Sequence, residues 1–465
     1  MIHVFNHYLP WRLVVLAGLE AVVLLIAVQV GVSLQIAELQ STISAGEAAA
    51  PSEVAAFTIG MMVFMASMGL YQSDQWNNTR CISARLVAPF ALALAMVALI
   101  AWVVPSLYPE VVLLGATTMT LALAGSLLVR TAFHRWSQLG AFKQRVLVLG
   151  TGSRVTKLAE YALRNPNHQV VGYVATQPGK HYVPSGLVLP KTQEESLLSI
   201  AERHRVNQIV LGVRDRRGGG FPVQELLECK MKGIRIVELP TFFEREYRQV
   251  MLESLNPSWM VLGDGFRQGF IRNVAKRLFD VTVSTALLVV CLPVLLLAAV
   301  CIYLESGLPV FYRQERVGRG GRVFTLYKLR SMRQDAERDG AAQWAAANDD
   351  RTTRVGRFLR TSRLDELPQI LNVLKGEMSF VGPRPERPVF VDQLAQQIPF
   401  YALRHSVKPG ITGWAQVRYA YGASVDDAVE KLQHDLYYVK NNSLFLDIMI
   451  LIATVEVVLW GKGAR

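Results

Sequence analysis

The sequence carries little charge and almost no cysteine. Charged residues make up 18% of its 465 residues, whereas an ordinary soluble domain has about 25%. Its four cysteines have neither the spacing of a disulfide framework nor that of a zinc motif, so both are excluded. Hydrophobic residues reach 51%, which excludes a disordered chain and favours a membrane protein. The formal net charge is nevertheless +12, and this excess of cations needs a local explanation.

Four apolar runs lie within the first 130 residues, at 13–34, 54–71, 86–104 and 111–129. Each is about long enough to cross a ~30 Å hydrocarbon core as a helix. Buried helices of a soluble protein are the alternative, but four runs joined by short links disfavour it. Basic residues precede the first run and follow the second and fourth, while the links after the first and third have none. We therefore predict a four-helix transmembrane bundle over 1–135 with both ends in the cytoplasm.

Glu20 lies inside the first apolar run, where a carboxylate is costly in lipid. It predicts either a contact with a neighbouring helix or a functional site.

Strand-like and helix-like segments alternate over 143–265. Apolar strands are predicted at 146–149, 169–175, 208–213 and 234–237, with helices from about 155 and at 194–205 and 223–232. This alternation is typical of a Rossmann-like α/β module. Gly150 and Gly152 match a dinucleotide-binding loop, but Val155 stands where the third glycine would be. A scaffolding or regulatory module is therefore as compatible with the pattern as a ligand site.

An uncharged run at 281–304 is interrupted by Pro293, and basic residues flank it on both sides. A crossing would carry the arginine-rich segment that follows out of the cytoplasm, against the positive-inside tendency. Proline removes a helical hydrogen bond and causes sharp kinks. We therefore predict a re-entrant membrane helix over about 278–304 that bends at Pro293. A plain fifth span is the alternative.

Cations are dense between Arg313 and Arg363, where thirteen Lys and Arg residues face six acids. No nucleic-acid-reading motif accompanies them, so we predict no nucleic-acid partner. Arg354, Arg357 and Arg360 recur every three residues and would form one stripe of a short helix. Such a stripe suits a diphosphate or an anionic membrane surface.

Two adjacent carboxylates, Asp365 and Glu366, follow this stripe. Magnesium-assisted phosphoryl transfer needs one carboxylate to hold the cation and another to attack phosphorus or handle a proton. A lone Asp-Glu pair is also common at a charged helix end. Arg384, in the proline-rich turn at 382–386, adds weight because its forked guanidinium suits phosphate.

Five segments resemble the bacterial polyprenyl-phosphate sugar-phosphate transferases, the long-form monotopic phosphoglycosyl transferases. They read FYRQERVG at 311–318, YKLRSM at 327–332, DELPQ at 365–369, LKGEMSFVGPRP at 374–385 and VKPGITGWAQ at 407–416. The resemblance implies an α-rich catalytic domain over 271–465. Further segments at 244–247, 255–259 and 417–423 resemble the subgroup associated with exosortase-linked exopolysaccharide clusters.

This resemblance implies a phosphotransferase that transfers sugar-1-phosphate from a nucleoside-diphosphate sugar, a UDP-hexose, to undecaprenyl phosphate. That reaction initiates exopolysaccharide or O-antigen repeat-unit assembly. By resemblance, Asp365 is the nucleophile that forms an aspartyl-phosphosugar intermediate, and Glu366 is its partner in binding Mg²⁺ or handling a proton. Lys328, Arg360 and Arg384 would surround the diphosphate. The enzyme would be a multi-pass protein of the bacterial inner membrane, with its catalytic domain among lipids at the cytoplasmic face. Homo-oligomerisation is left open.

The chain departs from the family at Leu292, because the re-entrant helix of the family usually bends at Ser-Pro. A membrane-bound nucleotide-sugar dehydratase or epimerase is an alternative function. It would need a Tyr-x-x-x-Lys pair, and none of the fifteen tyrosines has Lys four residues later. A catalytically decayed membrane scaffold is the second alternative, against which the intact Asp365, Glu366 and Arg384 speak.

Weaker site candidates are Glu377 and Glu386 for the metal and His405 for the nucleotide pocket, each with an ordinary structural role as the alternative. The apolar segment 444–460 contains Asp447 and Glu456 and predicts a packed or interfacial helix.

Overall fold

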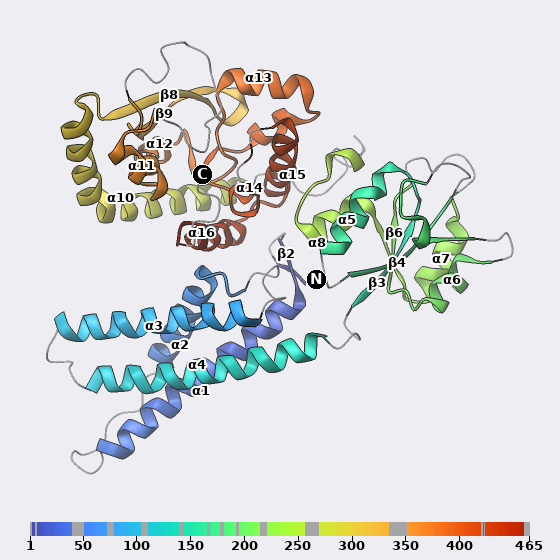
Figure 1. Ribbon diagram of the computed structural model, residues 1–465, viewed down its shortest axis with the longest axis horizontal. Helices are drawn as coiled ribbons and strands as arrows, with labels where there is room; N and C mark the ends of the chain where they lie inside the picture. The colour runs from blue at the N-terminus through green and yellow to red at the C-terminus, as the bar shows by residue number, and fades with distance from the viewer. Residues whose placement is uncertain are drawn as a thin grey trace. The chain divides into compact units, whose positions relative to one another are not determined.

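A computed structural model of the chain describes residues 2–4, 7–39, 51–71, 79–103, 110–138, 143–164, 168–176, 181–191, 195–213, 221–255, 269–333, 351–419, 422 and 424–459. The chain divides into two compact units (Figure 1). The first contains Pro10–Met62 and Leu70–Met260, and the second contains Ile2–Leu9, Val63–Gly69 and Val261–Arg465.

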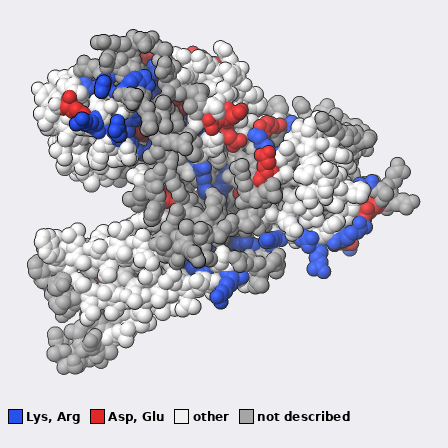
Figure 2. All heavy atoms as spheres, viewed as in Figure 1, with Lys and Arg blue, Asp and Glu red and all other residues white. Residues whose placement is uncertain are grey.

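Helices form at all four apolar runs near the start of the chain. They are α1 (Trp11–Leu39), α2 (Pro51–Ser67), α3 (Thr79–Val103) and α4 (Glu110–Gln138). Stretches of α1, α3 and α4 are long and apolar enough to cross a membrane, whereas α2 is a shorter apolar helix. On the face drawn in Figure 2, these helices show hardly any charge along their length. Their apolar sides thus suit lipid, as the composition predicts.

Glu20 of α1 forms an ion pair with Arg130 of α4. The Arg130 Nε lies 2.5 Å from Glu20 Oε1, and the Nη2 donates to Oε2 at 3.0 Å. Both side chains are at most 8% exposed, and Arg130 also donates to the carbonyl of Leu70 at 2.9 Å. Of the two roles predicted for Glu20, the contact between helices is therefore confirmed.

The α/β segment forms a sheet of five parallel strands in the order β5-β4-β3-β6-β7. The strands are β3 (Gln144–Leu149), β4 (His168–Val174), β5 (Val188–Leu189), β6 (Gln208–Leu211) and β7 (Arg235–Glu238). The helices are α5 (Thr156–Arg164), α6 (Leu197–Arg203), α7 (Val223–Met231) and α8 (Leu239–Tyr247). Side chains of α5 and α8 build one apolar core, and those of α6 and α7 build the other. Helices thus cover both faces of the sheet, and the predicted alternation is present. The sequence does not predict the two-residue strand β5 or helix α8.

Val155, at the position of the missing third glycine, is fully buried. It packs in the core that contains Leu158 and Val210. A methyl group built on Gly212 would lie 2.2 Å from its Cγ1. Val155 therefore fills the space beside Gly212, the residue that follows β6. A glycine at position 155 would leave this space empty.

The second unit contains the long helix α10 (Phe270–Ser306) and the antiparallel hairpin of β8 (Phe311–Val317) and β9 (Val323–Leu329). Next come α11 (Arg354–Thr361), the 3-10 helix Leu364–Gln369, α12 (Ile370–Lys375), and β10 (Ser379–Val381), which pairs in parallel with β11 (Gly410–Thr412). The remaining helices are α13 (Pro388–Gln397), the 3-10 helix Tyr401–Ser406, α14 (Trp414–Arg418), α15 (Val425–Asn441) and α16 (Leu444–Leu459).

Helix α10 contains Pro293 and packs at both ends against the same part of its unit. Near its start, Arg277 donates to the carbonyls of Val373 and Leu374 at 2.6 Å each. Near its end, Glu305 accepts the first backbone N–H groups of α11 at 2.8 and 3.1 Å. These two residues would be about 42 Å apart in a straight helix, and Figure 1 shows that α10 changes direction along its length. Both ends can therefore meet the α11–α12 region.

Helix α16 is fastened at its start by a buried carboxylate. Asp447 accepts hydrogen bonds from Lys276 of α10 and from the Tyr438 hydroxyl of α15, both at 2.7 Å. Among the described helices, α16 is not one of those long and apolar enough to cross a membrane. The prediction of a packed helix is therefore confirmed.

A segment from the start of the chain belongs to the second unit. Strand β1 (Ile2–Val4) pairs with β2 (His7–Leu9), and His7 is 1% exposed. Its Nδ1 lies 3.0 Å from the Tyr437 hydroxyl, and its ring lies edge-on to Trp414 at 5.6 Å between centroids. The sequence does not predict this packing.

Candidate active site

The two candidate carboxylates lie in the first turn of the 3-10 helix Leu364–Gln369. Thr353 caps the preceding helix α11 by accepting the Gly356 N–H at 2.9 Å. Arg363 has a positive φ of 55°, which ends that helix and starts the next. The 3-10 helix packs against β9, the strand that carries Lys328. The local fold thus brings Asp365 and Glu366 to a cationic strand.

Glu366 is held by two cations. Its Oε1 accepts from Arg384 Nη2 at 2.6 Å and from Lys328 Nζ at 3.3 Å, and its Oε2 has a longer contact of 3.4 Å to Arg384 Nη1. Burial alone would raise the pKa of Glu366, but the charges of Arg384 and Lys328 outweigh burial and lower it well below its ordinary value. Glu366 is therefore ionised and bound.

Asp365 differs from its neighbour, because no described residue donates a hydrogen bond to its carboxylate or forms an ion pair with it. It is 8% exposed. Burial raises its pKa, while the charge of Lys328 acts in the opposite direction. The pair thus combines one carboxylate that two cations hold with one that has no hydrogen-bond or ion-pair partner among the described residues.

The three predicted cations occupy different positions around the pair. Lys328 and Arg384 contact Glu366, as described. Arg360 is half-buried on α11, and its charge opposes the burial that raises the pKa of Asp365. Within the described ranges no hydrogen bond or ion pair engages its guanidinium. The rest of the predicted stripe, Arg354 and Arg357, is exposed. Of the stripe, Arg360 is thus the residue whose charge acts on Asp365.

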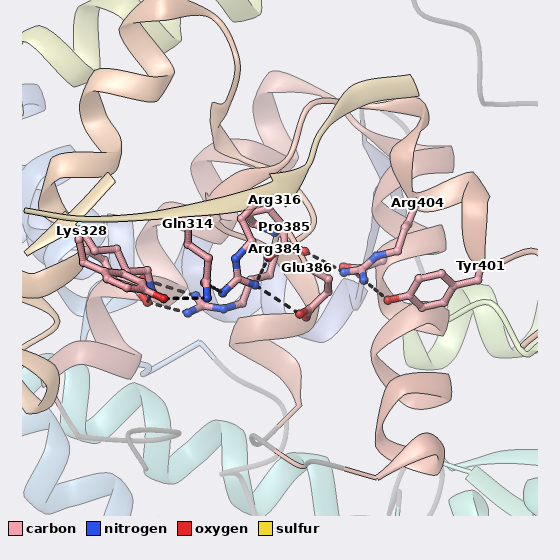
Figure 3. A network of polar contacts seen from close by, with 11 residues as sticks. Gln314, Arg316, Lys328, Arg384, Pro385, Glu386, Tyr401 and Arg404 are labelled. Carbon is pink, nitrogen blue, oxygen red and sulfur yellow. Dashed lines mark hydrogen bonds and ion pairs between the residues drawn. The ribbon is translucent and has the colours of Figure 1, made fainter. Parts of the chain in front are cut away.

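The sequence does not predict that two further arginines, Arg316 and Arg404, bind the backbone of the turn that carries Arg384 (Figure 3). Arg316 Nη1 donates to the Pro385 carbonyl at 2.9 Å, and Arg404 Nη2 donates to the Arg384 carbonyl at 3.0 Å. Arg404 also bonds Tyr401 Oη and Asp435 Oδ2. Arg316 lies in the segment 311–318 that resembles the family, which is the signal that could have pointed to it. Arg404 lies three residues before the segment 407–416 and carries no such signal.

The weaker candidates have structural partners. Glu377 accepts from Asn372 Nδ2 at 2.7 Å, and Glu386 forms an ion pair of 3.6 Å with Arg316. Burial and the charge of Arg404 lower the pKa of His405 to about 4, so its ring is neutral near pH 7. None of these contacts requires a ligand.

The donors present are compatible with a magnesium ion. No group of three or more His, Cys, Asp or Glu side chains in the described part of the chain could hold a metal ion by itself. Mg²⁺ is usually held by one or two carboxylates together with water and substrate phosphates. Asp365 is unengaged by the described residues, and Glu366 Oε2 has only its 3.4 Å contact, so these two residues fit that requirement.

Comparison with known proteins identifies the class of the second unit. Residues 271–461, from α10 to the end of α16, match the family described as "Bacterial sugar transferase". Together with helices able to span a membrane, this defines a membrane-associated sugar transferase.

Individual relatives narrow the class. The chain is 42% identical over 261 residues to "UDP-N-acetylgalactosamine-undecaprenyl-phosphate N-acetylgalactosaminephosphotransferase" of Aeromonas hydrophila, a match that covers 56% of this chain and 61% of that protein. It is 35% identical over 356 residues to "UDP-glucose:undecaprenyl-phosphate glucose-1-phosphate transferase" of Xanthomonas campestris pv. campestris, covering 73% and 72%. A protein of the same name from Escherichia coli (strain K12) is 43% identical over 189 residues, 40% of each chain. The chain belongs to the family of undecaprenyl-phosphate sugar phosphotransferases, which are enzymes.

Proposed function

We propose that this protein transfers sugar-1-phosphate from a UDP-hexose to undecaprenyl phosphate at the cytoplasmic face of a bacterial inner membrane, the first step in building an exopolysaccharide or O-antigen repeat unit. Relatives named for this reaction on glucose and N-acetylgalactosamine support the proposal. One observation carries it: Asp365, unengaged by any described residue, lies beside a second carboxylate that two cations hold.

In the proposed reaction, a carboxylate oxygen of Asp365 attacks the phosphorus that bears the sugar. The bond from this phosphorus to the bridging oxygen breaks, and UMP leaves with the electron pair. An oxygen of undecaprenyl phosphate then attacks the same phosphorus, and the bond to Asp365 breaks, which regenerates the carboxylate. Lys328, Arg360 and Arg384 neutralise the oxygens of the diphosphate while charge moves onto the leaving group.

Glu366 orients this machinery. It keeps Arg384 and Lys328 in place before substrate arrives, so that little reorganisation is needed when the diphosphate binds. Asp365 and Glu366 would hold Mg²⁺, which supplies positive charge to the phosphoryl oxygens when it is bound.

We propose further that α10 is a re-entrant membrane helix bent at Pro293. The support is that its start, through Arg277, and its end, through Glu305, contact the same unit, while its middle is apolar and exposed. Leu292 cannot provide the hydroxyl of the usual Ser-Pro bend, so contacts at the two ends would hold the bend.

The strand order β5-β4-β3-β6-β7 supports a Rossmann-like module in the first unit. The buried Val155 favours a scaffolding role over a dinucleotide site. Membership of the exosortase-associated subgroup rests on the motifs at 244–247, 255–259 and 417–423 and stays a prediction.

UMP release by the purified full-length protein tests the activity. The protein is incubated with undecaprenyl phosphate, Mg²⁺ and a panel of UDP-sugars, and we expect release with at least one sugar. Asp365→Ala should reduce release to background, while Asp392→Ala, at an exposed position of α13, should leave it unchanged. Full activity of Asp365→Ala would overturn the nucleophile assignment, and no release with any UDP-sugar would overturn the function.

Cysteine labelling tests the re-entrant helix. In a variant without the four native cysteines, Ser185→Cys in the α/β module and Thr325→Cys in β9 place single thiols at exposed positions. A membrane-impermeant maleimide should label both from the cytoplasmic side. Labelling of the two positions from opposite sides would show instead that α10 crosses the membrane.

A further inference from the structure

Two arginines hold consecutive carbonyls of the turn that presents Arg384. Arg404 donates to the Arg384 carbonyl at 3.0 Å, and Arg316 donates to the Pro385 carbonyl at 2.9 Å. They come from different parts of the second unit, because Arg404 lies in the 3-10 helix Tyr401–Ser406 and Arg316 lies in β8. Figure 3 shows both guanidinium groups beside this turn.

Arg404 is itself fastened by buried partners. Its Nη2 also donates to Asp435 Oδ2 of α15 at 2.7 Å, and its Nη1 donates to Tyr401 Oη at 2.6 Å. The side chains of Arg404 and Asp435 are 7% and 2% exposed. A planar guanidinium can reach three acceptors in fixed directions, which an ammonium group on a flexible stem cannot reproduce. The geometry at the Arg384 carbonyl is thus set from α15 through Arg404.

The turn transmits this restraint to the guanidinium of Arg384. Pro383 and Pro385 flank Arg384, and their rings fix φ on both sides. Gly382 leaves no room for a side chain, since a methyl group there would lie 2.3 Å from the Lys408 carbonyl oxygen. A shift of the Arg384 carbonyl must therefore move its side chain, which contacts Glu366 at 2.6 Å.

We propose that Arg404, anchored by Asp435 and Tyr401, is a positioning residue that acts through Arg384, and that Arg316 supports the same turn. The inference rests on the proposed function, since it assigns to Arg404 the placement of a cation that binds the diphosphate. Arg404 touches neither carboxylate of the candidate site. Its contribution is to place the Arg384 guanidinium against Glu366.

A double-mutant cycle tests the inference with two readouts, the kcat of UMP release and the affinity for UDP measured by calorimetry. The variants are Arg404→Lys, Arg384→Lys and the double variant, all in the full-length protein. Because a misplacement of about 1 Å can cost about 100-fold in rate, we expect Arg404→Lys to lower kcat by about 10- to 100-fold and to weaken UDP binding. In the Arg384→Lys background, Arg404→Lys should change kcat and the affinity for UDP by less than twofold each.

The matched control is Arg330→Lys. Arg330 is also a buried arginine of this unit, and it donates to the carbonyls of Ser306 and Gly307 at the end of α10. Its substitution should lower the unfolding temperature but act equally in both Arg384 backgrounds. If Arg404→Lys does not fold, Tyr401→Phe, which removes one acceptor of Arg404, replaces it in the cycle.

The outcomes separate the inference from the proposed function. Equal effects of Arg404→Lys in both backgrounds, or an unchanged kcat and UDP affinity, overturn the positioning role. If Arg404→Lys weakens UDP binding only when Arg384 is present, and no UDP-sugar gives UMP release, the positioning role is supported and the proposed function is overturned. Absence of both UDP binding and turnover in the wild-type protein overturns both.

Discussion

The substitution Glu366→Gln tests the electrostatics of the candidate site. The side chain of Glu366 is 12% exposed, and it lies 2.6 Å from Arg384 and 3.3 Å from Lys328. Glutamine keeps the shape and an acceptor oxygen but carries no charge. Two cations then lose the counter-charge that they share, and we expect the folded state to be destabilised.

The exposures of the three side chains set the magnitude. Removal of one partner from a buried ion pair costs about 3–5 kcal/mol, whereas an exposed pair contributes about 0–1 kcal/mol. Lys328 is 19% exposed but Arg384 is 33% exposed and partly screened by solvent. We therefore expect the free energy of unfolding to fall by about 2–3 kcal/mol. This corresponds to a melting temperature lower by about 4–12 °C for a unit of this size.

The pH dependence has a defined sign. The pKa of Glu366 is lowered in the folded state because the charges of Arg384 and Lys328 outweigh burial. Its contribution to stability is therefore complete above the ordinary glutamate pKa of 4.5 and is lost as the pH falls through the lower folded-state pKa. The difference between wild-type and Glu366→Gln should be full at pH 7 and should narrow in acid.

Tryptophan fluorescence of the detergent-solubilised full-length chain during heating measures the difference. Glu377→Gln is the control, because Glu377 accepts from the neutral Asn372 amide and should cost less than about 1 kcal/mol. Equal melting temperatures of wild-type and Glu366→Gln at pH 7 would refute the reasoning. A difference that stays constant into acid would refute its electrostatic part.

Three further predictions concern other parts of the second unit. Burial raises the pKa of Asp365, so kcat/KM for UMP release should fall with decreasing pH at a value above the ordinary aspartate pKa of 3.8. Lys328→Met should move this limb of the kcat/KM profile to still higher pH, and a shift to lower pH contradicts the assignment. Asp280 accepts hydrogen bonds from the Ser379 hydroxyl and the Phe380 backbone N–H at 3.0 Å each. Asp280→Ala should therefore lower the free energy of unfolding, measured with denaturant, by about 2–3 kcal/mol, and Asp280→Asn should lower it less. A larger loss in Asp280→Asn contradicts this prediction. His7→Ala removes a buried ring and should cost about 2–3 kcal/mol; an unchanged melting temperature shows that this segment does not stabilise the unit.

Elements that depend on local apolar patterning could be predicted from the sequence. The four early runs became helices, and the strand cores of the α/β segment fell within a few residues of their predicted positions, because long runs and buried strands carry their signal in themselves. Strand β5 was not predictable, since two residues show no periodicity and it exists only by pairing with β4. The strand pair β1–β2, which contains His7, could not be predicted either, because each strand has only three residues.

The site could be predicted only in part. Asp365 and Glu366 are adjacent in the sequence, and Lys328 and Arg384 were identified through motifs that resemble the family. No local pattern indicates that Glu366 binds both cations, Lys328 and Arg384, while Asp365 binds neither. The Arg404–Asp435 pair joins segments 31 residues apart and depends on the packing of α15, so it is visible only in three dimensions.

The contact between His7 and Tyr437 has a consequence for biosynthesis. The two residues are separated by 430 positions, and a ribosome that adds about 5–20 residues per second needs roughly 20–90 s to cover that distance. Helix α1 is made early in this interval, whereas Tyr437, which His7 contacts, is added only at its end. The short strand pair can therefore dock only after α15 has emerged, so a segment synthesised before α1 reaches its place after most of the second unit has been made.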